Sequence, residues 1–283
     1  MNGQPYCLPD GELERLLDQD APCGDATTFS LGIGDKPGRM VMRARQEMVL
    51  CGSEEARRLG ELRGLQASGL LAPSGTRLQA GDAILTLEGP ASGLHLVWKT
   101  AQTLIEYLSG IATCTAGIVA AARQANPDIG IACTRKNFPG TKAAAIKAIL
   151  CGGASPHRLS LSETLLVFAE HRAFLDNEEP VATIRRLRRE WPERAIVVEV
   201  GSEDEAQLWA SAGADIVQLE KLSPVAVAHL RQTLGNSPVR IAAAGGINSA
   251  NAEGYARAGA DILVTSAPYF APPRDVAVTL SAQ

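Results

Sequence analysis

The chain has 283 residues, of which 46% are apolar and 20% charged, and its formal net charge is −4. This length suits one large or two ordinary domains with a sizeable core, and the acidic balance excludes an overall basic surface for nucleic acid. We expect no apolar run of the roughly 18 residues that a membrane span needs. The N-terminal residues resemble neither a signal nor a transit peptide, so we expect a cytoplasmic protein.

The first hundred residues lack a regular alternation of strands and helices. Arg39–Cys51 and Thr76–Leu87 predict strands with glycine-containing turns, and Glu54–Ser68 predicts a helix. This layout is typical of a separate α+β domain, expected at residues 1–108. The boundary is expected near Leu104–Ser109, before a turn at Gly110, and the tail 272–283 could pack back on this domain.

The second half alternates short apolar runs with amphipathic segments. Near-continuous apolar runs are typical of parallel strands covered on both faces. The strands are predicted at Ile129–Cys133, Ala195–Glu199, Asp215–Leu219, Arg240–Ala244 and Asp261–Thr265. The helices are predicted at Thr141–Leu150, Val181–Trp191, Glu203–Ser211, Pro224–Leu234 and Ala250–Ala258. This alternation predicts an α/β domain over residues 109–271.

A helix–turn–strand unit is repeated at residues 202–220 and 248–266, and both copies contain the letters AGAD. In each copy, apolar or small residues recur at i, i+3, i+4 and i+7, which defines one helix face. Repetition of such a unit favours an α/β barrel over an open sheet. The alternative is that AGAD is simply a common turn from helix to strand.

Six cysteines are spread along the chain without a CxxC pair or a histidine at a metal-ligand spacing. We therefore expect free thiols, mostly buried, and no structural zinc site. The positions are Cys7, Cys23, Cys51, Cys114, Cys133 and Cys151.

Basic side chains gather in the segment Thr134–Arg158. Arg135 and Lys136 directly follow a predicted strand, and His157 and Arg158 begin the next strand or loop. Because the carboxyl ends of barrel strands meet at one mouth, these four side chains are expected to form a site for carboxylates or phosphates. The alternative is a solvated basic surface.

Acidic residues and small-residue turns follow the later strands. Glu199 and Glu220 could bind a metal or ribose and stabilise a cationic sugar carbon, or pair with a lysine such as Lys221. Late barrel loops commonly bind phosphate through backbone N–H groups. The residues expected in this role are Gly245, Gly246, Ser266 and Ala267.

Several motifs together resemble the quinolinate phosphoribosyltransferase family over nearly the whole chain. They are LSGIAT within Lys99–Thr115, TRK and PG within Thr134–Gly140, GG and HR within Gly152–Arg158, VEV at Val198–Val200 and GGI at Gly245–Ile247. The resemblance implies an N-terminal α+β domain, an incomplete α/β barrel, and a homodimer whose active site is shared between subunits. It also implies transfer of phosphoribosyl from phosphoribosyl diphosphate, in the presence of Mg²⁺, to a nitrogen base.

The resemblance further assigns roles by position. Arg135, His157 and Arg158 would hold the carboxylate-bearing base, and Lys136 would contact the phosphoribosyl diphosphate donor. Glu199 and Glu220 would face the ribose and the metal. Lys99, contributed to the partner's site, and Lys142 would be further basic positions.

Three positions depart from the family pattern. The family normally has arginine where this chain has Lys99, aspartate where it has Glu220, and lysine where it has Phe168. Replacing a lysine by Phe168 removes a charge from a dicarboxylate pocket and adds an aromatic wall. The segments WKTAQ, GGIN and VTSAPY look closer to the ModD pyrophosphorylases, a branch associated with molybdenum transport operons.

Three functions are therefore compared. The first is a phosphoribosyltransferase for an aromatic base less acidic than quinolinate, linked to molybdenum utilisation. The second is a true quinolinate phosphoribosyltransferase of NAD biosynthesis, with Lys99 and Lys142 supplying the missing charge. The third is a non-catalytic anion-binding protein.

Overall fold

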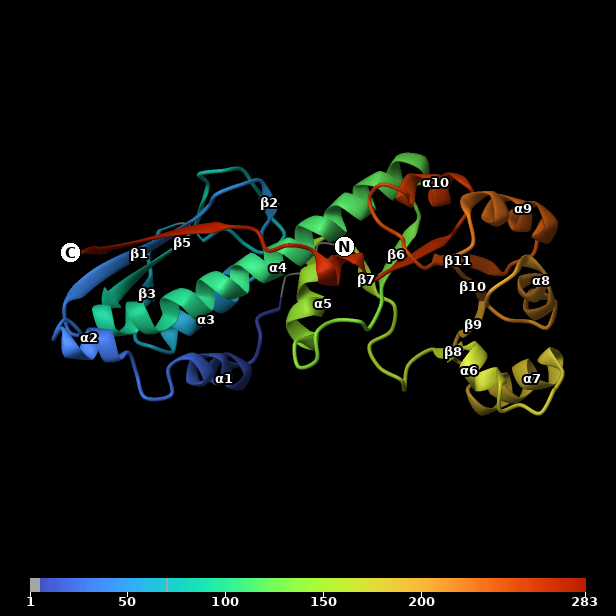
Figure 1. The fold of residues 1–283 in the computed structure, drawn as a ribbon, viewed down its shortest axis with the longest axis horizontal. Helices are drawn as coiled ribbons and strands as arrows, with labels where there is room; N and C mark the ends of the chain where they lie inside the picture. The colour runs from blue at the N-terminus through green and yellow to red at the C-terminus, as the bar shows by residue number, and fades with distance from the viewer. Residues whose placement is uncertain (1–5, 70) are drawn as a thin grey trace. The chain divides into compact units, whose positions relative to one another are not determined.

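The computed structural model describes residues 6–69 and 71–283, which form two compact units (Figure 1). Unit 1 comprises residues up to Ala116 together with Phe138–Gly152 and Pro268–Gln283, and unit 2 comprises Gly117–Asn137 and Gly153–Ala267. We expect neither a signal nor a transit peptide in the N-terminal segment, and the start of that segment lies outside the described residues.

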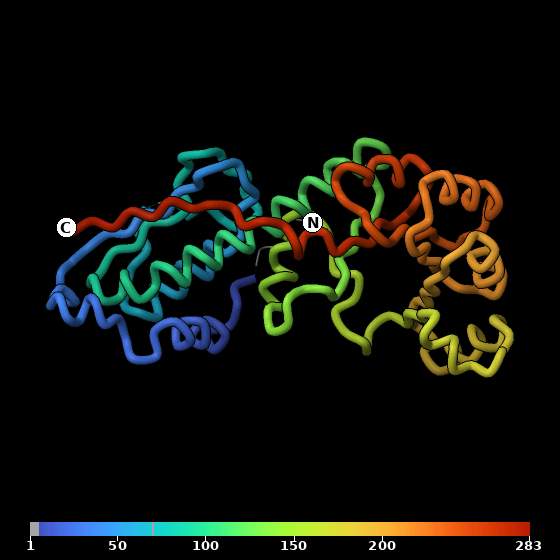
Figure 2. The backbone as a smooth tube through the Cα atoms, viewed as in Figure 1, coloured from blue at the N-terminus to red at the C-terminus, as the bar shows by residue number. Residues whose placement is uncertain are grey.

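Unit 1 contains a four-stranded antiparallel sheet in the order β13-β1-β5-β3. Its strands are β13 (Val276–Ala282), β1 (Pro37–Ala44), β5 (Ala83–Pro90) and β3 (Gln66–Ala67). The C-terminal segment pairs with β1 from Ala44↔Val276 to Gly38↔Ala282 and runs beside it in Figure 2. Buried and exposed positions alternate along most of β1, because successive strand side chains point to opposite faces.

Helices and a second, two-stranded antiparallel sheet of β2 and β4 complete unit 1. The elements are α1 (Asp10–Asp20), α2 (Ala26–Ser30), α3 (Ser53–Glu61), α5 (Lys142–Cys151), β2 (Met48–Val49) and β4 (Arg77–Leu78). The predicted strand Arg39–Cys51 is broken by a bend between β1 and β2, and the predicted helix Glu54–Ser68 stops at Glu61 and gives way to β3. Both predictions were too long because the chain bends to form new pairings, β2 with β4 in the two-stranded sheet and β3 with β5 in the four-stranded sheet.

Helix α5, expected in the barrel domain, belongs to unit 1. Its Lys147 side chain is 1% exposed and donates to Glu55 at 2.6 and 2.8 Å and to Glu54 at 2.8 Å, both on α3. Ala144 and Ala148 also join the main core of this unit. A buried ammonium between two carboxylates therefore fixes α5 to α3.

Helix α4 (Ala91–Ala125) runs for 35 residues without the turn predicted at Gly110. A Cβ at Gly110 would lie 2.4 Å from the carbonyl oxygen of Pro272, so the glycine allows close packing rather than a turn. An 18-residue window of α4 is apolar enough to cross a membrane, contrary to the expectation, but half of it is buried in the protein. Its hydroxyls at Ser109 and Thr113 accept from the backbone N–H groups of Cys51 and Val49, as in a core helix.

Unit 2 is a seven-stranded parallel sheet with helices, which confirms the predicted α/β fold with an incomplete barrel. The strand order is β7-β6-β12-β11-β10-β9-β8. The strands are β7 (Ser155–Pro156), β6 (Gly130–Cys133), β12 (Ile262–Thr265), β11 (Arg240–Ala244), β10 (Ile216–Glu220), β9 (Ile196–Val200) and β8 (Leu165–Val167). All paired neighbours are parallel, so their carboxyl ends lie at one edge.

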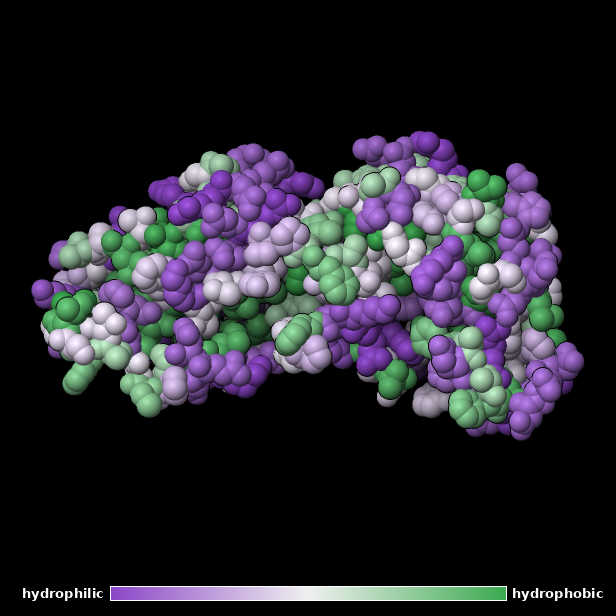
Figure 3. Space-filling view, viewed as in Figure 1, coloured by the Kyte–Doolittle hydropathy of each residue, from purple (hydrophilic) through white to green (hydrophobic). Residues whose placement is uncertain are grey.

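The helices of unit 2 cover the outer side of this sheet (Figure 1). They are α6 (Ala169–Arg172), α7 (Pro180–Glu190), α8 (Glu203–Ser211), α9 (Pro224–Leu234) and α10 (Ala252–Arg257), and the short helix η1 (Ala267–Phe270) follows β12. Figure 3 shows hydrophilic side chains along the outer edge of this unit, beyond α8 and α9. The amphipathic segments therefore turn apolar faces to the strands and polar faces outward.

The repeated AGAD letters have the same structural role in both copies. Asp215 accepts from the N–H of Ile196, and Asp261 accepts from the N–H of Ile241, each at 2.7 Å. Each aspartate thus pairs with the strand beside its own. The repeat therefore encodes a side-chain link between neighbouring strands in addition to a turn.

Candidate active site

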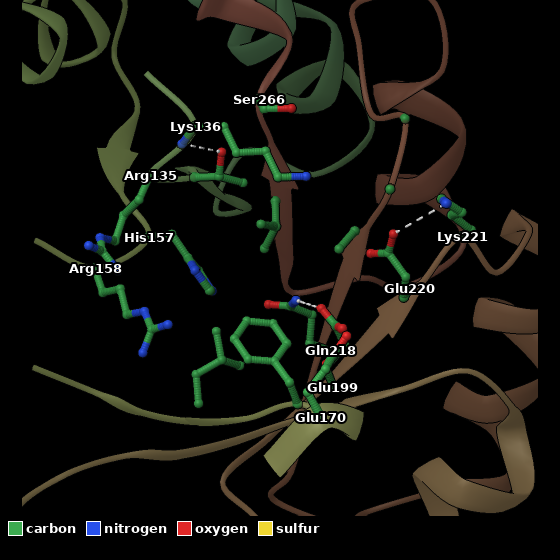
Figure 4. Close-up of a pocket in the computed structure, with 17 residues that line it drawn as sticks. Arg135, Lys136, His157, Arg158, Glu170, Glu199, Gln218, Glu220, Lys221 and Ser266 are labelled. Carbon is green, nitrogen blue, oxygen red and sulfur yellow. Dashed lines mark hydrogen bonds and ion pairs between the residues drawn. The ribbon is translucent and has the colours of Figure 1, made fainter. Parts of the chain in front are cut away.

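A cavity of about 960 Å³ opens at the carboxyl ends of the unit 2 strands. Parallel α/β folds place their ligand sites at this edge. The residues that line it are Thr134, Arg135, Lys136, His157, Arg158, Leu166, Phe168, Glu170, Glu199, Gln218, Glu220, Lys221, Ala244, Gly245, Gly246, Val264 and Ser266. Ten of the thirteen positions expected from the sequence lie together here (Figure 4).

Positive charge gathers on one side of the cavity. Arg135 and Lys136 follow β6, and His157 and Arg158 follow β7. Burial and the neighbouring Arg135 lower the pKa of the Arg158 guanidinium. Because its charged form is disfavoured by desolvation and by a like charge, the opposite charge of a bound anion would compensate for both effects. This side is therefore suited to binding carboxylate or phosphate.

The His157 imidazole is placed among these cations. Burial first, and then Arg158, lower its pKa, so the ring is mainly neutral at pH 7 and carries one N–H. It can donate or accept a hydrogen bond, while the net positive charge comes from the neighbouring arginines.

Phe168 forms an aromatic wall beside these cations. Its ring stacks on His171 with centroids 5.7 Å apart, and its N–H donates to His171 Nδ1 at 3.0 Å. The Arg158 guanidinium lies 5.9 Å from the centre of the same ring. His171 does not line the cavity, so it supports Phe168 from outside. The wall presents a flat apolar surface on which a ring could stack.

Two carboxylates stand at the ends of β9 and β10. Burial, followed by repulsion from Glu220, raises the pKa of Glu199. A carboxylate whose ionisation is opposed by a second carboxylate nearby is stabilised in its charged form by a cation or a developing positive charge. Glu199 and Glu220 are the residues that could contribute to a Mg²⁺ site.

The described residues include no group of three or more His, Cys, Asp or Glu side chains arranged to hold a metal ion. Mg²⁺ commonly takes one or two carboxylates and completes its shell with water and substrate phosphates. The pair formed by Glu199 and Glu220 fits that pattern of binding together with a diphosphate.

Gln218 is a cavity residue that sequence reasoning missed. Its side chain donates from Nε2 to Glu199 Oε2 at 2.8 Å, and the residue is 4% exposed. Its buried Oε1 has no well-formed hydrogen bond within the described residues. His157 lies nearby, and its contact with Gln218 raises the pKa of the imidazole against the larger effects of burial and Arg158. The available signal was a single amide inside the apolar strand IVQLE. Gln218 therefore orients the Glu199 carboxylate.

A glycine turn lies on the other side of the cavity. Gly245 and Gly246 both have positive φ, at 87° and 79°, a conformation that glycine adopts without steric cost. Ser266 also lines the cavity, whereas Ala267 does not, and the Ala267 N–H donates to Thr265 Oγ1 at 3.1 Å. The Ala267 N–H, which we expected to bind phosphate, therefore already has an acceptor within the protein.

Lys99 and Lys142 belong to unit 1 and do not line this cavity. Lys99 is exposed on α4, with Nζ 4.4 Å from the centre of the Trp98 ring and 3.2 Å from Gln102 Oε1. Lys142 is the exposed first residue of α5. Their contribution to a site stays a prediction.

Comparisons with known proteins extend over most of the chain. Residues 25–109 match the family model "Quinolinate phosphoribosyl transferase, N-terminal domain", and residues 111–279 match the corresponding C-terminal domain. "Putative pyrophosphorylase ModD" of Rhodobacter capsulatus is 44% identical over 255 residues, covering 90% of this chain and 98% of the relative. The "Probable nicotinate-nucleotide pyrophosphorylase [carboxylating]" of Methanothermobacter thermautotrophicus is 32% identical over 258 residues, covering 89% and 91%.

Solved structures show the same fold. The nicotinate-nucleotide pyrophosphorylase of Francisella tularensis superposes with a TM-score of 0.88 at 23% identity, covering 99% of this chain and 100% of that one. The sequence identity is low, so this likeness concerns the arrangement of the backbone.

Proposed function

The chain belongs to the quinolinate phosphoribosyltransferase family, and we propose that it transfers phosphoribosyl from phosphoribosyl diphosphate to an aromatic base less acidic than quinolinate. The family consists of phosphoribosyltransferases, enzymes of the pentosyltransferase class. The finer proposal concerns the acceptor. It is supported by the cavity that combines anion-binding side chains, an aromatic wall and paired carboxylates.

The cavity residues suggest how the reaction would proceed. Arg135, His157 and Arg158 would hold an anionic or polar group of the base and orient its ring against Phe168. The base nitrogen would then attack the anomeric carbon of the donor as the bond to diphosphate breaks. The electron pair of that bond leaves with the diphosphate.

The charged groups opposite would act on the donor. Lys136 would bind the diphosphate, whose charge grows on departure. Glu199 and Glu220 would stabilise the positive charge that develops on the sugar, and Gln218 holds the Glu199 carboxylate in place. Mg²⁺, when bound with the donor, would neutralise part of the diphosphate charge.

Phe168 is the observation that favours an altered acceptor. The resemblance places a lysine at this position, and the ring instead lies beside Arg158, supported by His171. A dicarboxylate would lose one counter-charge and meet an apolar face, whereas a base with one carboxylate or none would keep its stacking surface.

Further properties are proposed on family grounds. We expect a cytoplasmic homodimer in which Lys99 reaches the partner's cavity and Lys142 adds positive charge. The similarity to ModD proteins supports a role linked to molybdenum utilisation.

The test is a steady-state assay of diphosphate release with phosphoribosyl diphosphate, Mg²⁺ and a panel of aromatic bases that carry two, one or no carboxylates. We expect turnover with bases of the last two kinds and little with quinolinate. Absence of release with every base would overturn the proposal. Calorimetric binding of molybdate without binding of phosphoribosyl diphosphate would instead support an anion-binding protein.

The variant Phe168→Lys distinguishes the altered acceptor from true quinolinate activity. If Phe168 excludes the dicarboxylate, the variant should raise kcat/KM for quinolinate by about tenfold or more, the value of one charge-assisted hydrogen bond. Phe168→Leu is the matched control, because it removes the ring without adding charge. Efficient quinolinate turnover by the unaltered protein, unchanged in Phe168→Lys, would favour the quinolinate enzyme.

A further inference from the structure

Lys221 lines the cavity and has no part in the proposed reaction. It directly follows β10 and adopts a left-handed backbone conformation with φ of 59°. Side chains other than glycine, asparagine and aspartate adopt this region at a steric cost. Its N–H donates to the carbonyl of Ala244 at 2.8 Å, which ties this conformation to the end of β11.

The backbone conformation carries the side chain across the glycine turn. A Cβ at Gly245 would lie 2.5 Å from Lys221 Cγ and 2.9 Å from its backbone nitrogen. The lysine stem therefore packs on the Cα of Gly245, and only glycine leaves room for it. The stem of the side chain therefore starts beside the turn that includes Gly246.

The Lys221 ammonium is only weakly neutralised. The side chain is 78% exposed, and Nζ lies 3.9 Å from Glu220 Oε1, at the limit of an ion pair. Exposed pairs of this kind contribute little. The charge is therefore available to a ligand that enters the cavity.

Lys221 lies on the opposite side of the cavity from Arg135 and Arg158 in Figure 4. The cavity thus has positive charge on two sides, with the carboxylates of Glu199 and Glu220 between them. One cationic side can hold the base, while the other lies beside a glycine turn, a kind of backbone that commonly accommodates phosphate.

We propose that Lys221 binds a phosphate group of the donor substrate, over the Gly245–Gly246 turn. The identity of that donor rests on the proposed function. The binding itself depends only on the chemistry shared by a sugar phosphate and a diphosphate, namely a compact anion with several acceptor oxygens.

The test measures binding of two probes, ribose 5-phosphate and inorganic diphosphate, to the full chain by calorimetry. Lys221→Asn removes the charge and keeps a residue that tolerates positive φ. We expect it to weaken at least one probe by about tenfold to a hundredfold, whereas Lys221→Arg should stay within about threefold. Lys36→Asn, an exposed lysine of unit 1, is the matched control and should bind like the unaltered protein.

Thermal melting separates loss of binding from loss of folding. The melting temperature of Lys221→Asn should not fall, because the strained conformation suits asparagine better. Equal binding of both probes by Lys221→Asn and the unaltered protein, or no binding of either by the unaltered protein, would overturn the proposal. A lower melting temperature with unchanged binding would likewise show that Lys221 only pairs with Glu220.

These outcomes differ from those that test the proposed function. Loss of probe binding in Lys221→Asn, with no base turned over by the unaltered protein, would support Lys221 and contradict the transferase. Turnover by Lys221→Asn with an unchanged KM for the donor would leave the transferase standing and contradict the role of Lys221.

Discussion

The adjacent glycines Gly245 and Gly246 allow the crowding at the glycine turn to be measured. Both have positive φ, so alanine at either position should cost about 1–2 kcal/mol for the left-handed conformation. A Cβ at Gly246 would meet nothing within 4 Å, whereas one at Gly245 would lie 2.9 Å from the backbone nitrogen of Lys221 and 3.1 Å from Glu220 Oε1. Backbone atoms cannot rotate away, and such overpacking adds about 1–3 kcal/mol.

The free energy of unfolding should therefore fall by about 2–5 kcal/mol in Gly245→Ala and by about 1–2 kcal/mol in Gly246→Ala. Urea denaturation followed by tryptophan fluorescence measures both, with the slope of the transition checked for equality. Gly245→Ala should also weaken diphosphate binding, because the Lys221 stem must move. Equal losses in the two variants would show that the close approach of Lys221 to Gly245 is wrong.

Two other changes should have defined effects. Lys147→Met removes an ammonium that is 1% exposed and leaves the carboxylates of Glu54 and Glu55 without their counter-charge. The free energy of unfolding, measured in urea, should therefore fall by about 3–5 kcal/mol. A loss below about 1 kcal/mol would contradict the buried cluster. Burial and Glu220 raise the pKa of Glu199 in the folded protein. The favourable contribution of its protonated carboxyl to the free energy of unfolding is therefore lost as the pH rises through that pKa. In the presence of a chelator, Glu199→Gln should therefore melt at a higher temperature than the unaltered protein at pH 7. Below the ordinary pKa of 4.5 the two proteins should melt at the same temperature. A lower melting temperature of Glu199→Gln at pH 7 would contradict the raised pKa of Glu199.

Much of unit 2 could be predicted because its signals are local. Helices α8 and α9 begin and end at the predicted residues, and strand β11 matches its prediction in full. Each element carries its own apolar pattern and is bounded by neighbours such as the capping Ser202, whose hydroxyl accepts from Glu205. Parallel strands of known direction then bring their carboxyl ends together, which is why Arg135 and Glu199 could be expected in one cavity.

The tertiary structure decided features that depend on residues far apart in the sequence. Gly110 predicted a turn, but it lies inside α4, where the absence of a Cβ leaves room for the backbone of Pro272. Lys147 looked like an ordinary helix residue until α3 placed two carboxylates around it. Gln218 was hidden in an apolar strand, although its amide holds Glu199.

The sequence by itself determined the order of the elements, the parallel sheet and the cationic character of the cavity, because periodicity and charge are properties of neighbouring residues. Only the tertiary structure decided that Lys221 crosses Gly245 and that Arg158 lies beside Phe168. Those contacts depend on close approach between side chains and backbone at the ends of separate elements. Sequence patterns specify which groups are present, whereas the distances between them arise from packing.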